Sequence, residues 1–158
     1  MNRRAVLAAA AALPVAAVPA LAGREHKPAI LGLEQQPGTH AVGDELRALL
    51  TKQAAQWTAG DLEGFCSHYG DDAIFVSPSG RTDGRAAVYQ RYLKKYVDKR
   101  GMGALSLEVL HLVADGDAAS IAMTWRLAFE GKAPAEGYSV IGLERRAGAW
   151  KIVHDASM

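Results

Sequence analysis

Four long strand-like segments fill the second half of the chain, at residues 104–114, 118–130, 137–146 and 149–157. The turns that join them are short and contain turn-forming residues: Asp115-Gly116, residues 131–134 and Ala147-Gly148. Connections this short join antiparallel neighbours, so the four segments predict an antiparallel meander. Each segment is longer than the usual strand of about five to six residues, and long antiparallel strands twist and curl.

The residues before this meander have helical periodicity. Asp44 is typical of a helix N-cap, and apolar residues follow it at helical spacing as far as Gly60. Asp61 begins a short second helix, and Asp83-Gly84 begins a third that continues to the glycines at 101 and 103. In the third helix the spacing predicts an apolar face made by Ala86, Tyr89, Leu93 and Tyr96, with Tyr92 beside it.

One more strand is predicted at residues 73–77, followed by a turn at residues 80–84. Helices followed by a meander indicate an α+β fold. We expect a curved antiparallel sheet wrapped around three N-terminal helices, which forms a cone with a ligand pocket at its mouth. On the convex face, Ala122 and Ala128 allow close packing against a second sheet, so we expect a homodimer through that face.

The first 22 residues have the three parts of an export signal. Arg3 and Arg4 precede an apolar run rich in alanine, and Ala20-Leu21-Ala22 provides a cleavage site between small residues. We predict a signal peptide at 1–22, a linker at 23–41 and one domain at 42–158, periplasmic or secreted, with no membrane partner after cleavage. The arginine pair resembles a twin-arginine export signal, and an uncleaved membrane anchor is the alternative interpretation.

Charge and the positions of cysteine and histidine exclude several function classes. With 18 basic and 17 acidic residues, the formal net charge is +1, which is not the electrostatic pattern of a nucleic-acid partner. Cys66 is the single cysteine, so no internal disulfide is possible, and we expect it to be buried. The 5 histidines lack metal-ligand spacing, and no phosphate-binding glycine loop occurs, so we expect no metal and no cofactor.

Three segments carry a resemblance to a known family: residues 57–63 (Trp-Thr-Ala-Gly-Asp-Leu-Glu), residues 69–80, and residues 150–155 (Trp-Lys-Ile-Val-His-Asp). In these segments and in the order of its elements, the stretch 42–158 resembles the nuclear transport factor 2-like superfamily. This superfamily includes SnoaL-like polyketide cyclases and ketosteroid isomerases, and the pattern is most similar to the association domain of calcium/calmodulin-dependent protein kinase. The resemblance implies a cone-shaped scaffold that different members of the superfamily use for different functions. Those members that are enzymes use Asp, Tyr or His residues of the pocket.

The resemblance also implies which side chains face the pocket. The inward set is Trp125, Val153, Asp155 and Ser157, and the set facing a dimer partner is Trp150, His154 and Ala156. The pocket histidine of the association domain is similar in position to His111. Its pocket arginines have no counterpart here, because Trp125, Ile141 and Ser157 occupy the matching positions. This difference argues against an anionic ligand of the kind that those arginines would hold.

Asp155 is the first candidate for a catalytic group. A carboxylate inside an apolar cone is desolvated, which raises its pKa and suits a general acid or base. His111 is the second candidate, as an acid–base partner facing Asp155 across the sheet. The alternatives are an Asp155 that is exposed or paired at a strand end and a His111 with a structural role. The predicted ligand-binding residues are aromatic or hydroxyl side chains: Trp57, Tyr69, Phe75, Ser77, Tyr92, Tyr96, Trp125 and Ser139.

Three functional hypotheses follow from these residues. The first is an exported domain that binds a small apolar molecule in a mostly apolar pocket. The second is a cofactor-independent isomerase, cyclase or dehydratase that uses Asp155 as general acid or base. The third is a self-assembling interaction module, which the likeness to the association domain suggests.

Overall fold

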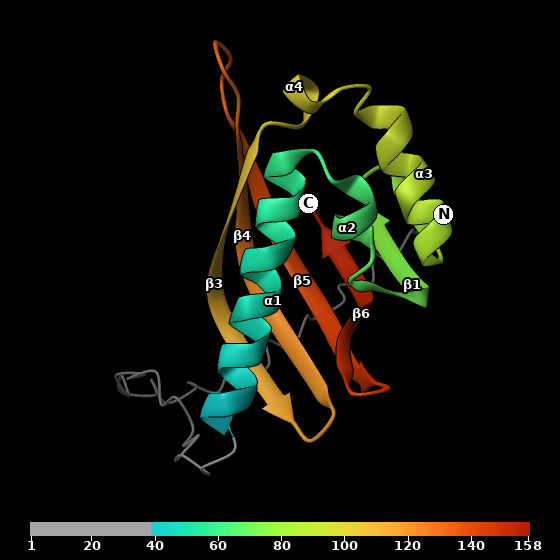
Figure 1. The fold of residues 1–158 in the computed structure, drawn as a ribbon, viewed down its shortest axis with the longest axis vertical. Coiled ribbons are helices and arrows are strands. Elements are labelled where there is room, and N and C mark those ends of the chain that lie inside the picture. Colours follow the sequence, from blue (N-terminus) through green and yellow to red (C-terminus); the bar gives the residue numbers. More distant parts are fainter. Residues whose placement is uncertain (1–38) are drawn as a thin grey trace, which may run out of the picture. The chain divides into compact units, whose positions relative to one another are not determined.

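The computed structural model describes residues 39–158, so the predicted signal peptide and most of the predicted linker lie outside the described residues. The helices are α1 (Thr39–Ala59), α2 (Leu62–Cys66), α3 (Arg85–Lys95) and α4 (Lys99–Met102), as Figure 1 shows. The strands are β1 (Tyr69–Ser77), β2 (Gly80–Asp83), β3 (Ala104–Asp115), β4 (Ala118–Ala128), β5 (Ala135–Arg146) and β6 (Ala149–Ser157). Within residues 39–158, no helix is both long enough and apolar enough to cross a membrane.

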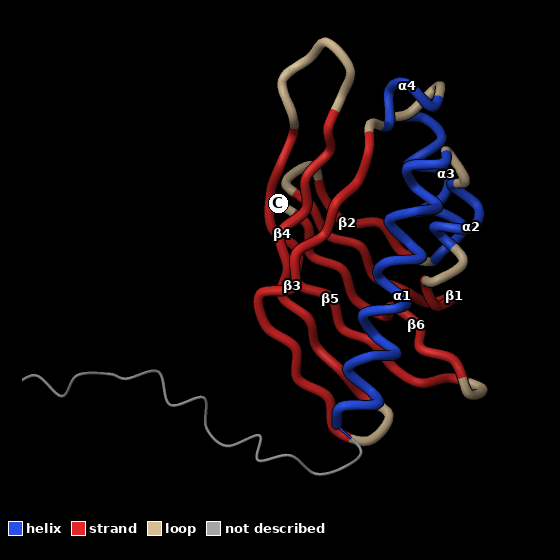
Figure 2. Tube along the Cα trace, turned by 60° about the vertical axis from the view of Figure 1, so that its left-hand side comes forward, coloured by secondary structure: helices blue, strands red, loops and turns tan. Residues whose placement is uncertain are grey.

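The strands form one sheet in the order β2-β1-β6-β5-β4-β3. The meander from β3 to β6 is antiparallel throughout, and β1 extends it by pairing parallel to β6. Figure 2 shows that the helices cover one side of the curved sheet. The predicted α+β fold, with a curved sheet around N-terminal helices, is confirmed. The third predicted helix, expected to continue to the glycines at 101 and 103, is divided into α3 and the short helix α4.

The first helix begins earlier than its capping signal predicts. α1 starts at Thr39, so Asp44 lies exposed inside the helix and is not its N-cap. Val42 packs against the core, and Leu46 and Leu50 continue the same buried stripe. Because packing of this apolar stripe stabilises an extra helical turn, tertiary contact overrides the local capping preference.

α3 buries only part of the predicted face. Ala86 is exposed and Leu93 is 40% exposed, whereas Val88 is fully buried. Val88, Tyr92 and Tyr96 follow at intervals of four residues, so they share one face, and both tyrosines pack against the core. The prediction is confirmed for Tyr89, Tyr92 and Tyr96 and wrong for Ala86 and Leu93, because apolar residues occur on two faces of this segment and only packing in the folded chain decides which face is covered.

A second strand replaces the turn that was predicted at residues 80–84. β1 and β2 form a hairpin in which Phe75 pairs with Thr82 and Ser77 pairs with Gly80. Gly80 has a φ of 118°, which a residue with a side chain rarely adopts, and this conformation permits the reversal of the chain. A strand as short as β2 has too little alternation to be recognised from the sequence.

A β-bulge in β6 decides which of its side chains face the helices. The ladder between β5 and β6 shifts register at Val153, which is therefore an extra residue in β6. Because the bulge interrupts the alternation, Trp150 and Ile152 belong to the same core as the helices. The prediction that Trp150 faces outward is wrong, since its ring is buried and its Nε1 donates to Glu45 of α1 at 3.0 Å.

Candidate functional site

A cavity of about 380 Å³ is lined by the helices and the inner face of the sheet. Its helical wall is aromatic and consists of Trp57 from α1, Phe65 from α2, and Tyr92 and Tyr96 from α3 and the residue after it. Trp57 makes edge-to-face contacts with the other three rings, at centroid distances of 5.0, 5.4 and 4.9 Å. Its Nε1 donates to the backbone oxygen of Met102 at 3.0 Å, so the ring is held at both its face and its polar atom.

The opposite wall consists of alternate side chains from the inner face of the meander. They are Leu105, Leu107, Met123, Trp125, Leu127, Ile141 and Ile152. The Trp125 ring lies close to Gly137 on the neighbouring strand, where a Cβ atom would be 2.6 Å from the ring. Its Nε1 donates to the backbone oxygen of Tyr138 at 3.3 Å. The cavity is therefore walled by apolar and aromatic groups on both sides, as ligand pockets commonly are.

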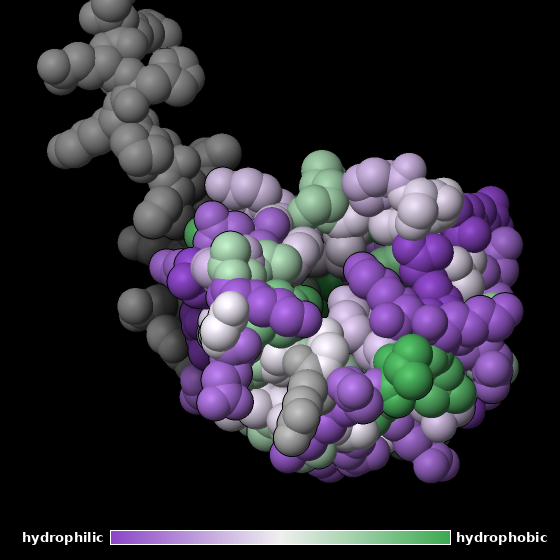
Figure 3. All heavy atoms as spheres, turned by 90° about the horizontal axis from the view of Figure 1, so that it is seen from above, coloured by the Kyte–Doolittle hydropathy of each residue, from purple (hydrophilic) through white to green (hydrophobic). Residues whose placement is uncertain are grey.

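The cavity has an exposed end and a buried end. Pro78, Ser79, Lys95 and Met158 are the exposed members of its lining, so they mark the mouth. Its buried polar residues are Gln53, Ser139 and Asp155, at 3%, 4% and 7% exposure, together with the hydroxyl of the buried Tyr69. Figure 3 shows a hollow among polar side chains on the face seen from above, with hydrophobic atoms at its depth.

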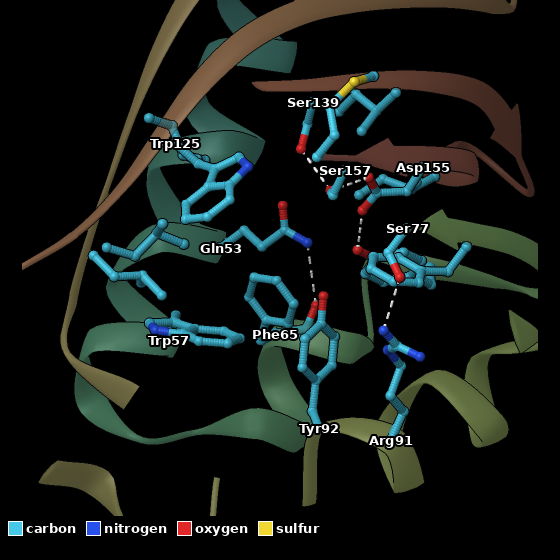
Figure 4. Close-up of a pocket in the computed structure, with 18 of the residues that line it drawn as sticks. Gln53, Trp57, Phe65, Ser77, Arg91, Tyr92, Trp125, Ser139, Asp155 and Ser157 are labelled. Atoms are coloured by element: carbon cyan, nitrogen blue, oxygen red, sulfur yellow. Dashed lines mark hydrogen bonds between the residues drawn. The ribbon is translucent and has the colours of Figure 1, made fainter. Parts of the chain in front are cut away.

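A chain of hydrogen bonds surrounds the carboxyl group of Asp155. Tyr69 donates to its Oδ2 at 2.5 Å, and Ser157 donates to its Oδ1 at 2.8 Å. The Ser157 hydroxyl also lies 2.6 Å from that of Ser139. Figure 4 shows Ser139, Ser157 and Asp155 linked along one side of the cavity. Both carboxyl oxygens thus have protein partners, and the network ends at Ser139 on β5.

Burial controls the protonation of this network. Desolvation raises the pKa of Asp155 above that of an exposed aspartate, and the hydrogen bonds from Tyr69 and Ser157 oppose the rise. Desolvation, and then the nearby charge of Asp155, raise the pKa values of Tyr69 and Tyr92 well above their usual range. The two tyrosines therefore remain neutral hydrogen-bonding groups, and Asp155 is the acidic side chain of this network.

The structure brings most of the predicted site residues together. Asp155 lines the cavity, and so do all of the predicted ligand-binding residues: Trp57, Tyr69, Phe75, Ser77, Tyr92, Tyr96, Trp125 and Ser139. Ser157, which the resemblance placed inward, lines it too, whereas Val153 does not because it is the bulge residue. Their role in binding or catalysis stays a prediction.

The expected position of His111 is wrong. It is exposed on β3 and does not line the cavity, and β4 and β5 separate β3 from the strand that carries Asp155. A register shift between Val109 and His111 marks a bulge in β3. Beyond that bulge, His111 pairs with Ala122 and therefore shares the outer face of the sheet. His111 cannot act as the acid–base partner of Asp155.

Several residues that line the cavity were not predicted from the sequence. Gln53 precedes Trp57 by one helical turn, so helical spacing from that residue could have found it. Arg91 and Lys95 line the cavity from α3, at its mouth side. The pocket arginines of the association domain match strand positions of this chain, whereas Arg91 and Lys95 lie on a helix. Comparison with that domain therefore does not predict them.

Two other features bear on the chemistry of the site. Within residues 39–158, no three side chains of His, Cys, Asp or Glu gather in a way that could hold a metal ion. Cys66 is buried and unbonded, and burial raises the pKa of its thiol to about 12. The thiol is therefore protonated at neutral pH, which makes it a poor nucleophile.

Comparison with known proteins identifies the family. The sequence profile of the SnoaL-like domain matches residues 50–153. No curated protein matches the chain. Among solved structures, an NTF-2-like protein of unknown function from Shewanella oneidensis is 24% identical with a TM-score of 0.69, and the match covers 73% of this chain and 97% of that one.

Two further structures have the same fold. A ketosteroid isomerase-like protein from Erwinia carotovora atroseptica is 17% identical, with a TM-score of 0.59 and coverage of 72% of this chain and 92% of that one. A protein from Thiobacillus denitrificans, described as a putative calcium/calmodulin-dependent protein kinase type II association domain, is 19% identical. Its TM-score is 0.61, and the match covers 70% of this chain and 91% of that one. Family and fold support a ligand-binding or isomerase-like domain in general. The chain belongs to the SnoaL-like domain family, within the nuclear transport factor 2-like superfamily.

Proposed function

We propose that this chain is an exported domain that binds a small, mostly apolar molecule in its cavity. The observation that carries the proposal is the composition of the cavity walls. Aromatic rings from three helices face mostly aliphatic side chains from the sheet, and one group of polar side chains lies around Asp155 at the buried end. Burial of apolar ligand surface contributes about 25 cal/mol per Å², so walls of this kind favour an apolar ligand body.

The polar groups around Asp155 supply orientation. Ser139 and Ser157 carry hydroxyls that can both donate and accept, and Asp155 can donate when it is protonated. A hydroxyl or carbonyl group at the inner end of a ligand would find partners here. Few polar groups in an otherwise apolar pocket are the usual way to select one ligand orientation.

A second candidate function is a cofactor-independent isomerase, cyclase or dehydratase. The contact between Tyr69 and Asp155 favours it, because a buried carboxyl with a raised pKa suits proton transfer to and from a carbonyl compound. Tyr69 would be the hydrogen-bonding partner of Asp155 in such a reaction, since His111 lies on the other face of the sheet. Binding remains our first choice because both carboxyl oxygens already have donors.

We also propose that two copies of the chain associate through the outer face of the sheet. Val140 alternates with the cavity-lining Ser139 and Ile141, so it faces outward, and it pairs with Ala122 on one side and Ala156 on the other. Val76 follows in the same row, and both valines are more than 40% exposed. An apolar row bordered by small residues fits a second copy of the same face.

The first experiment is native mass spectrometry of the protein purified from the periplasm of its own host. We expect a chain that begins at Gly23 and carries a reproducible extra mass. Trp125→Ala should reduce the ligand-bearing fraction about tenfold, since it removes part of one wall, whereas Asp155→Asn should change it only a few-fold. Circular dichroism of both variants checks that the fold is kept.

Other outcomes point to the other candidates. A chain that carries no ligand, together with turnover of a carbonyl substrate that Asp155→Asn abolishes, would replace binding by catalysis. A chain that begins at Met1 and fractionates with membranes would overturn the proposed export. Assemblies larger than a dimer would favour the interaction module.

A further inference from the structure

Arg91 lines the cavity, and its guanidinium group is held there by neighbouring side chains. It is half-buried on α3, and its Nη2 donates to the hydroxyls of Ser77 at 2.8 Å and Ser79 at 2.5 Å. Its guanidinium carbon lies 5.2 Å from the centroid of the Phe75 ring, within the range of a cation–π contact. Figure 4 shows the guanidinium beneath Ser77, at the edge of the residues that line the cavity. Three neighbours therefore hold this group in one place.

These contacts leave the charge of Arg91 uncompensated within residues 39–158. The side chain forms no ion pair with the described residues, whereas Arg81, Arg85, Arg126, Arg145 and Arg146 each pair with a carboxylate. Only Nη2 is engaged, so the N–H groups of Nε and Nη1 have no partner in the described part of the chain. An arginine whose position is fixed and whose N–H groups are free can donate hydrogen bonds to an oxyanion.

A second cation lies on the same side of the cavity. Lys95 follows Arg91 by one helical turn, lines the cavity, and forms no ion pair within the described residues. α3 itself contains no Asp or Glu, from Arg85 to Lys95. The mouth therefore carries positive charge, whereas the carboxyl group of Asp155 lies among the buried residues of the cavity. The two ends of the cavity therefore differ in chemistry and in access to water, with cationic side chains at the mouth and a carboxyl group at the buried end.

We infer that the ligand is an amphipathic organic acid, whose carboxylate is held at the mouth by Arg91 and Lys95 and whose apolar body fills the aromatic cavity. This inference rests on the proposed binding function and specifies its ligand class. A carboxylate can accept from the free N–H groups of Nε or Nη1, and a position at the mouth keeps the anion partly hydrated. The reverse orientation would bring a carboxylate against Asp155, and like charges or a forced protonation would oppose it.

The expectation against an anionic ligand rested on arginines that the sheet lacks. The proposed anion site is built from α3 and the β1–β2 turn, where Ser77 and Ser79 hold the guanidinium. Its geometry depends on tertiary contact between a helix and a hairpin. For this reason a comparison of strand positions alone does not reveal it.

The test compares two probes by isothermal titration calorimetry at neutral pH. They are 2-naphthylacetic acid and 2-(2-naphthyl)ethanol, which share a ring system and differ in charge at one end. The wild-type protein should bind the acid at least tenfold more tightly than the alcohol, and added salt should narrow this preference. Arg91→Met should remove this preference. The affinity for the acid should fall about tenfold, whereas the affinity for the alcohol should change less than about twofold.

Lys94→Met is the matched control, because Lys94 is an exposed cation of the same helix that does not line the cavity. It should keep the preference for the acid. Arg91→Lys retains the charge but has fewer N–H donors. It should keep part of the preference for the acid, and it replaces Arg91→Met if that variant does not fold.

The outcomes separate this inference from the proposed function. Equal affinity of the wild-type protein for acid and alcohol would overturn the inference and leave a binding function in place. Equal losses in Lys94→Met and Arg91→Met would also overturn it, since the effect would then be one of overall charge. Failure of both probes to bind would count against the proposed function itself.

Discussion

At the scale of single residues, Asp155 is a carboxyl group in a buried environment. Its side chain is buried, and desolvation raises its pKa. A carboxyl group with a raised pKa in the folded state contributes its full stability below the ordinary pKa of about 3.9. That contribution is lost as the pH rises through the raised value, because an ionised carboxylate must then stay buried.

Asp155→Asn should therefore change how stability depends on pH. The free energy of unfolding of the wild-type protein should fall relative to that of the variant as the pH rises above 4, because the amide cannot ionise. Urea denaturation followed by tryptophan fluorescence, at a series of pH values, measures this difference. A difference that does not change with pH would show that the carboxyl group ionises without cost in the folded protein.

Asp72→Asn is the control for this prediction. The hydrogen bonds from Arg146 lower the pKa of Asp72, an exposed residue near the start of β1. A group whose pKa is lowered by folding contributes stability when the pH is above its ordinary pKa. This contribution is lost as the pH falls through the lowered pKa. The pH dependence of the difference from wild type should therefore have the opposite sign, and it should be small because the pair is exposed.

At the scale of elements, the sheet depends on places where two strands approach closely. Gly137 on β5 lies between the Trp125 ring of β4 and the backbone of Met158, and a Cβ atom there would collide with the Met158 backbone oxygen. Next to it, Tyr138 and Met158 exchange backbone hydrogen bonds of 2.8 and 2.9 Å. No side chain fits at Gly137 unless the Trp125 ring or the C-terminus moves.

Gly137→Ala should consequently destabilise the protein by about 1–3 kcal/mol, the usual cost of overpacking. Gly43→Ala is the matched control, since this glycine lies inside α1 with no atom within 4 Å of an added Cβ. It should stabilise the protein by about 0.5–1 kcal/mol, because alanine is the better helix former. Thermal unfolding of both variants tests the pair, and a neutral Gly137→Ala would mean that the β5 contact with the C-terminus adapts freely.

At the scale of the whole molecule, the outer face of the sheet predicts the oligomeric state. Light scattering of the mature protein should give the mass of a dimer. Val140→Arg should shift the equilibrium toward the monomer by tenfold or more in Kd, equivalent to about 1.4 kcal/mol, because it places a charge in the middle of an apolar row. A dimer that survives this substitution would place the interface elsewhere.

Val97→Arg is the control for the oligomeric state. Val97 is 89% exposed in the loop after α3, so the same change of residue there does not touch the sheet. It should leave the mass of the dimer unchanged. Loss of the dimer in both variants would indicate an effect of added charge rather than of the outer face.

The sequence by itself determined the succession of helices followed by an antiparallel meander, and the aromatic composition of the cavity. Alternation in long strands and helical spacing of apolar residues are local patterns, and they remain readable without any contact partner. The resemblance to the nuclear transport factor 2-like superfamily, added to these patterns, predicted that Trp125 and Asp155 face the pocket beside Trp57 and Tyr92, and the structure brings these residues together around one cavity.

Only the tertiary structure decided the features that depend on register and on contacts between distant segments. One-residue bulges in β3 and β6 put His111 on the outer face and Trp150 in the core, and no local signal in the sequence marks such an insertion. The contact between Arg91 and the β1–β2 turn likewise exists only after α3 packs against the hairpin. Side-chain direction in a strand reverses with each residue, so one extra residue changes the chemistry of a whole face.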